Sequence, residues 1–81
     1  MSQGVRPLSV IALDIQSTWG TKVNFAAKPY LAAMLTLDKI TDTYYADSAR
    51  SVVRYFLSNA NYWRGDDAKR IKAELKALLA N

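Results

Sequence analysis

The sequence predicts an all-α protein, a compact bundle of about four short helices. Much of the 51% apolar content is Ala and Leu, and only three Gly and two Pro interrupt the 81 residues. Apolar residues also recur at intervals of three and four along most of the chain, which is the helical period. We expect residues 1–7 to be a flexible N-terminus and residues 8–81 to form a single helical domain.

The first helix is predicted over about residues 8–19. Pro7 suits its start and Gly20 suits a left-handed cap at its end. One apolar stripe runs along it, formed by Leu8, Ile11, Ala12, Ile15 and Trp19. Val10 and Leu13 lie outside this stripe, so they either complete the core or form a surface for protein contact.

A second helix is predicted over about residues 26–37. Pro29 must lie in or near its first turn, because a deeper proline would remove a backbone hydrogen bond. Residues 38–46 are polar and β-branched, which indicates a loop with at most one helical turn. Within it, Tyr44 and Tyr45 either form a hydrophobic staple on the next helix or present an exposed binding surface.

The third helix is predicted from an N-cap at Asp47 to about Asn59, and the fourth over about residues 67–80 with Asp66 as its N-cap. On the fourth helix, Arg70 and Glu74 are placed to pair at positions i and i+4. The expected core comprises Ile11, Ile15, Trp19, Leu31, Met34, Leu35, Val52, Val53, Phe56, Ile71, Leu75 and Leu78.

The connection between these two helices contains Tyr62, Trp63 and Arg64, followed by a turn glycine. Trp, Tyr and Arg together are typical of interaction hot spots. For Trp63 we favour a structural interpretation, in which the indole fills the end of the bundle between the two helices. For Arg64 a binding role and a hydrogen bond to terminal helix carbonyls remain equal alternatives.

The chain contains no Cys and no His. It therefore lacks thiolate nucleophiles, cysteine zinc ligands and the usual proton shuttle of neutral pH. Its carboxylates are spread along the chain, and we expect no enzymatic activity, no cofactor and no metal. With no apolar run of about 18 residues and no features of a signal peptide, we also expect no membrane association and a cytoplasmic location.

The formal net charge of +4 arises in the second half of the chain. Residues 1–47 contain four basic and four acidic side chains, whereas residues 48–81 contain seven basic and three acidic ones. This half suggests nucleic-acid binding, although solvated helix faces give the same pattern. Asp66 and Asp67 argue against a recognition helix in the major groove. The candidate contacts are Arg50, Arg54, Lys69, Lys72 and Lys76.

Four segments carry a resemblance to a known group: Lys28–Met34, Tyr55–Ala60, Trp63–Gly65 and Ile71–Lys76. In these segments the chain resembles small helical proteins encoded by bacteriophages and prophages, notably those of actinobacteria. The resemblance covers about residues 8–80 and implies an accessory role in a bacterial host cell. It implies no site residue.

We therefore expect a small non-enzymatic binding protein, a phage accessory protein that contacts a host or viral protein or self-associates. The candidate interaction residues are Val10, Leu13, Tyr44, Tyr45, Tyr62 and Arg64. The alternative is a nucleic-acid-binding accessory protein that uses the basic C-terminal half.

Overall fold

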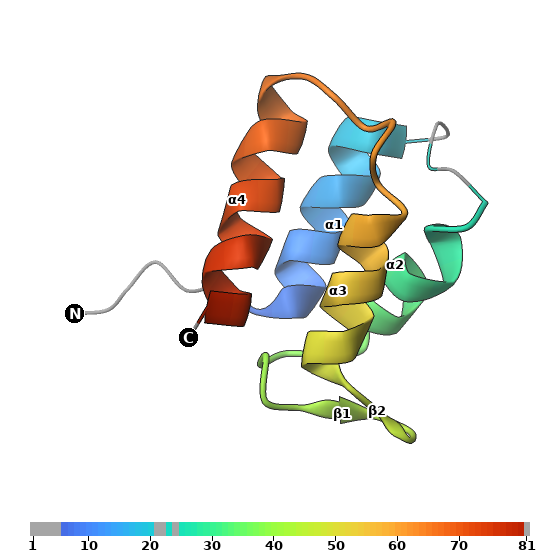
Figure 1. Ribbon diagram of the computed structural model, residues 1–81, viewed down its shortest axis with the longest axis vertical. Coiled ribbons are helices and arrows are strands. Elements are labelled where there is room, and N and C mark those ends of the chain that lie inside the picture. The colour runs from blue at the N-terminus through green and yellow to red at the C-terminus, as the bar shows by residue number, and fades with distance from the viewer. Residues whose placement is uncertain (1–5, 21–22, 24, 81) are drawn as a thin grey trace.

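The computed structural model describes residues 6–20, 23 and 25–80. In this part of the chain the helices are α1 (Leu8–Trp19), α2 (Lys28–Met34), α3 (Ala49–Ser58) and α4 (Asp66–Ala80). The strands β1 (Thr43–Tyr44) and β2 (Asp47–Ser48) form a small antiparallel hairpin between α2 and α3 (Figure 1). The protein is mostly helical, as predicted, but the hairpin makes the all-α prediction wrong in detail.

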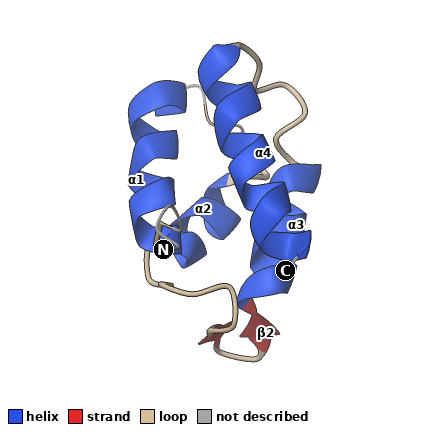
Figure 2. Cartoon of the chain, turned by 90° about the vertical axis from the view of Figure 1, so that its left-hand side faces the viewer, coloured by secondary structure: helices blue, strands red, loops and turns tan. Residues whose placement is uncertain are grey.

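The helices surround one core. Helix α1 contacts α2 and α4, and α3 contacts the same two helices. In Figure 2, α4 lies in front with α1 and α3 on either side and α2 behind. Helices α1 and α3 run in one direction and α4 runs in the opposite one (Figure 1). None of the helices found in residues 6–20 and 25–80 has the length and apolarity needed to cross a membrane.

The predicted core residues are buried, except that Leu35 and Leu78 are half-buried at its edge. Trp63 joins this core: it is 4% exposed and stacks on Trp19, with ring centroids 5.0 Å apart. Phe56 meets both indoles edge-on. The structural interpretation of Trp63 is confirmed, since its ring fills the end of the bundle beside α1 and α3.

The predicted bounds of the first helix are confirmed, whereas α2 is shorter than predicted at both ends. Pro29 lies at its second residue, and the chain leaves the helix after Met34 through tight turns that bond residues three apart. These turns bring the carbonyls of Leu37 and Asp38 to the first N–H groups of α1, at 2.7 and 2.8 Å. Helix α1 thus begins on backbone acceptors from a distant segment, because its own N-cap is a proline without a capping side chain.

The predicted loop at residues 38–46 contains β1 and the turn of the hairpin. Thr43 pairs with Ser48 and Tyr44 with Asp47, which leaves Tyr45 and Ala46 in a two-residue turn. Tyr45 adopts a positive φ of 54° there, a conformation that usually favours Gly or Asn. The turn therefore lacks the usual hairpin signal in its sequence.

Two predicted helix caps are wrong. Asp47 belongs to β2, and the N-cap of α3 is Ser48, whose hydroxyl accepts a hydrogen bond from the Ser51 N–H at 3.1 Å. Asp66 is the first residue of α4 instead of its cap, and Gly65 precedes it with φ of 111°. The carbonyl of Gly65 accepts the first helical hydrogen bond, from the N–H of Lys69.

An ion-pair network joins α1, α4 and Arg6, a residue assigned above to the flexible N-terminus. Arg6 donates to Glu74 and Asp14, and Arg70 donates to Asp14 and Asp67, at 2.6 to 3.1 Å. The predicted Arg70–Glu74 pair is therefore wrong, since Arg6 binds Glu74 with two nitrogens. Hydrogen bonds from Arg70 and then Arg6 hold the pKa of the Asp14 carboxyl below its usual range. Residues 1–5 lie outside the described residues.

Replacing Gly65 with alanine should destabilise the protein by about 1–3 kcal/mol, because φ of 111° strains any L side chain. No atom lies within 4 Å of the added methyl, so the effect reports backbone strain alone. Urea unfolding followed by tryptophan fluorescence measures it. A midpoint equal to that of the wild type would contradict the described path of the chain into α4.

Asp14→Asn should lower the free energy of unfolding by about 1 kcal/mol near neutral pH, because two partly exposed ion pairs are lost. The pKa of Asp14 in the folded protein lies below its ordinary value of 3.8, so the stabilisation is complete above about pH 5 and declines as the pH falls through the ordinary value and then the folded one. Urea unfolding of both proteins across this range should show the difference shrinking in acid. Asp47→Asn is the control, since this exposed carboxylate forms no ion pair with described residues. A difference that stays constant in acid contradicts the prediction.

Candidate nucleic-acid interface

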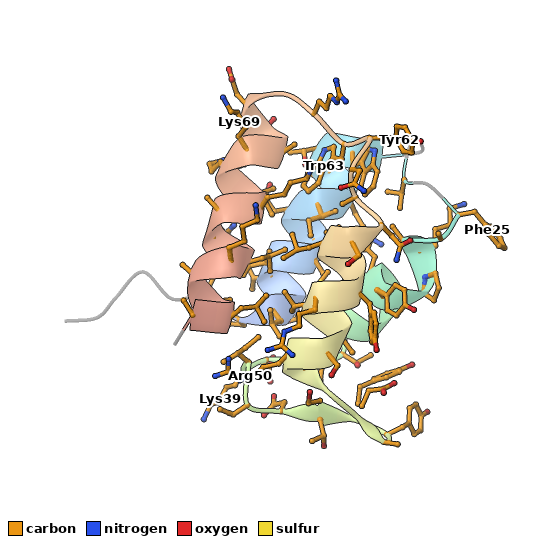
Figure 3. All side chains as sticks on the ribbon, viewed as in Figure 1. Phe25, Lys39, Arg50, Tyr62, Trp63 and Lys69 are labelled. Carbon is orange, nitrogen blue, oxygen red and sulfur yellow. The ribbon has the colours of Figure 1, made fainter. Side chains whose placement is uncertain are left out.

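The structure places Lys69, Lys72 and Lys76 of α4 beside Arg64 on one side of the molecule and ties Arg50 to the end of α4. We call this side the basic face and define it by Arg50 and Arg54 on α3, Arg64 in the following loop, and Lys69, Lys72 and Lys76 on α4. In Figure 3, Lys69 lies near the loop end of α4 and Arg50 near the hairpin end of α3. The face therefore extends along the length of both helices.

Specific contacts make the basic face continuous across the two helices. The Nη1 atom of Arg50 donates to the carbonyl of Leu79 at 2.8 Å, which ties the start of α3 to the end of α4. Arg54 follows one helical turn later on α3 and is exposed. At the other end, Lys72 lies within electrostatic range of both Arg64 and Lys76.

Lys72 differs from the other lysines because it supports the fold. Its Nζ donates to the carbonyl of Trp63 at 2.6 Å and lies 5.9 Å from the centre of the indole ring. Burial lowers the pKa of the Lys72 ammonium group, and the charges of Lys76 and Arg64 lower it further. Lys72, predicted as a candidate nucleic-acid contact, is thus also fixed against the loop.

The charges on α4 are segregated. On the flank toward α1, the carboxylates of Asp67 and Glu74 are paired with arginines. On the flank toward α3, none of the described carboxylates forms an ion pair with Arg54, Arg64 or the three lysines. Arg54, Arg64 and the three lysines thus present positive charge without an ion-pair partner among the described residues.

A surface hollow of about 430 Å³ lies at the loop end of the basic face. We call it the Trp63 hollow. Its polar and aromatic walls come from Asn61, Trp63, Arg64, Lys69 and Lys72. The cations gathered around it are suited to an anionic group such as a phosphate.

The predicted protein-interaction residues do not form one surface. Val10 and Leu13 are exposed on the outer side of α1, by 41% and 57%. Tyr44 is half-buried against the core, while Tyr45 is exposed at the tip of the hairpin; because Ser48 is the N-cap of α3, neither tyrosine holds the staple position directly before it. Tyr62 and Arg64 lie in the α3–α4 loop, at the opposite end of the molecule (Figure 1). Arg64 forms no hydrogen bond with described residues.

Sequence reasoning missed two residues of this region. Asn61 lines the Trp63 hollow, but an asparagine in a connection is ordinary turn chemistry and gives no separate signal. Arg6 pairs with Glu74, the residue predicted to pair with Arg70, and only the tertiary fold places Arg6 beside α4. Within residues 6–20, 23 and 25–80, no three Asp or Glu side chains are grouped as they are at a metal site.

No protein-family model, no curated protein and no solved structure matches this chain. The function is therefore inferred from the geometry of the basic face.

Proposed function

We propose that this protein binds nucleic acid through its basic face, without base-specific readout and without catalysing a reaction. The segregation of charge across α4 carries this proposal. Paired carboxylates occupy the flank toward α1, whereas Lys69, Lys72 and Lys76 on the opposite flank have no ion-pair partner among the described residues. A polyanion on that flank supplies counterions and releases its own condensed ions, which favours binding.

Several features support binding in place of catalysis. The sequence has no His and no Cys. Of the described carboxylates, Asp14, Asp67 and Glu74 are bound to arginine side chains, so their oxygens are already occupied. The resemblance to phage-encoded proteins, which is part of this proposal, suggests an accessory role in the cytoplasm of a bacterial cell.

Lys69→Gln and Lys76→Gln, singly and together, should weaken binding of a mixed-sequence nucleic acid. Each removes one phosphate contact, so the slope of log K against log salt should decrease by about 0.7 to 0.9 per substitution. Both side chains are exposed, and the folded state should be unaffected. Fluorescence anisotropy at a series of salt concentrations measures the slope.

The matched control is Lys28→Gln, because Lys28 is an exposed lysine on α2, away from the basic face. This variant has the same net charge as either single variant but retains every cation of the basic face. The slope of log K against log salt should therefore equal that of the wild type. Equal weakening by Lys28→Gln would show dependence on net charge alone and contradict the assignment of this face. Absence of binding by the wild type at low salt would refute the function.

A second candidate function is protein contact or self-association through α1. The observation that favours it is the exposure of Val10 and Leu13, which lie three residues apart and therefore on one side of the helix. Two adjacent apolar side chains form a small patch, well below the area that a stable interface needs. We therefore rank this function below nucleic-acid binding.

If α1 mediates self-association, the mass in solution should increase with protein concentration, and Leu13→Asp should abolish that increase while the helical circular-dichroism spectrum is retained. Association would bury the aspartate carboxylate in a contact that excludes water, and the loss of its hydration is unfavourable. Ala77→Asp, the same charge change at an exposed position of α4, is the control. Sedimentation equilibrium that reports a monomer at every wild-type concentration excludes this candidate.

A further inference from the structure

Two neighbouring hollows meet at Asn61, at the loop end of the basic face. One is the Trp63 hollow, and the other, of about 300 Å³, lies between the turn before α2 and the end of α3. Asn61 lines both, and Tyr62 lines the second. A ligand that follows the surface from one hollow to the other therefore passes beside Tyr62.

Phe25, in the turn before α2, is also exposed but lines neither hollow, so the exposed aromatic ring that lines one of them is that of Tyr62. It is 83% exposed and forms no hydrogen bond or ring contact with any described residue. Trp63 next to it is 4% exposed, and its ring is stacked on Trp19 inside the core. A ligand can stack on Tyr62 but not on Trp63 (Figure 3).

The Trp63 hollow provides the charge that such a ligand needs. Arg64 and Lys69 are exposed and have no ion-pair partner among the described residues. Lys72 is held at the wall by its hydrogen bond to the Trp63 carbonyl, so its ammonium group keeps a fixed position. An exposed ring beside a cationic hollow matches a base with its adjoining phosphate.

We propose that the basic face binds single-stranded nucleic acid, with an unpaired base stacked on Tyr62 and the adjoining phosphate in the Trp63 hollow. This inference rests on the proposed function and specifies its partner. A duplex keeps its base faces inside the stack and offers only phosphates and groove edges, so Tyr62 adds nothing to its binding. Asp66 and Asp67, at the start of α4, further oppose insertion of that helix end into a groove.

The test compares three fluorescein-labelled probes at one ionic strength: oligo(dT) of about 20 nucleotides, an abasic deoxyribose-phosphate strand of equal length, and a mixed-sequence duplex. The oligo(dT) should bind about 5- to 150-fold more tightly than the abasic strand, since the two differ only in the bases. Tyr62→Ala should remove this preference and leave abasic-strand binding unchanged. Tyr62→Phe, which retains a stacking ring, should preserve it.

Tyr45→Ala is the matched control, because Tyr45 is 89% exposed and lies on the hairpin at the opposite end of the molecule (Figure 1). It should bind all three probes as the wild type does. Equal affinity for oligo(dT) and the abasic strand would overturn the stacking inference while leaving the proposed function intact. Loss of the preference in Tyr45→Ala would also overturn it. If none of the three probes binds, the proposed function itself fails.

Discussion

The contact between Trp19 and Trp63 determines the shape of the candidate site. Trp19 ends α1, and Trp63 lies in the loop between α3 and α4, yet their rings are nearly parallel, at 9°. Phe56 of α3 packs edge-on against both. Burial of three aromatic rings stabilises the domain by several kcal/mol and fixes where the loop can run. The residues on either side of Trp63, Tyr62 and Arg64, are exposed as a consequence.

The asymmetry of α4 follows from Arg6. Its guanidinium binds Glu74 through two nitrogens and also reaches Asp14, so Arg70 turns to Asp14 and Asp67. A bidentate arginine pair is stronger than a single contact between exposed charges, which explains why the pair at i and i+4 does not form. Asp67 and Glu74 are thereby paired with arginines on the flank toward α1, and neither forms an ion pair with the lysine flank.

Helices with clear apolar periodicity could be predicted from sequence, because local pattern and burial agree in α1, α3 and α4. The end of α2 and the hairpin could not. Helix α2 ends where the carbonyls of Leu37 and Asp38 turn to α1, and this partner is some thirty residues away in the chain. The hairpin turn at Tyr45 has no glycine or asparagine to mark it. Asp47 and Ser48 are equally good caps by residue type, and strand pairing decides between them.

The residue types of the candidate site were also predictable, but their grouping was not. Spacing alone put Lys69, Lys72 and Lys76 on one flank of a helix, whereas the approach of Arg50 to Leu79 and of Arg64 to Lys72 depends on the tertiary fold. The same fold gives these cations unequal roles. Lys72 both lines the hollow and holds the Trp63 carbonyl, so its replacement alters stability and charge together. Lys69 and Lys76 form no such contact with described residues, and a loss of binding on their replacement reports the surface itself.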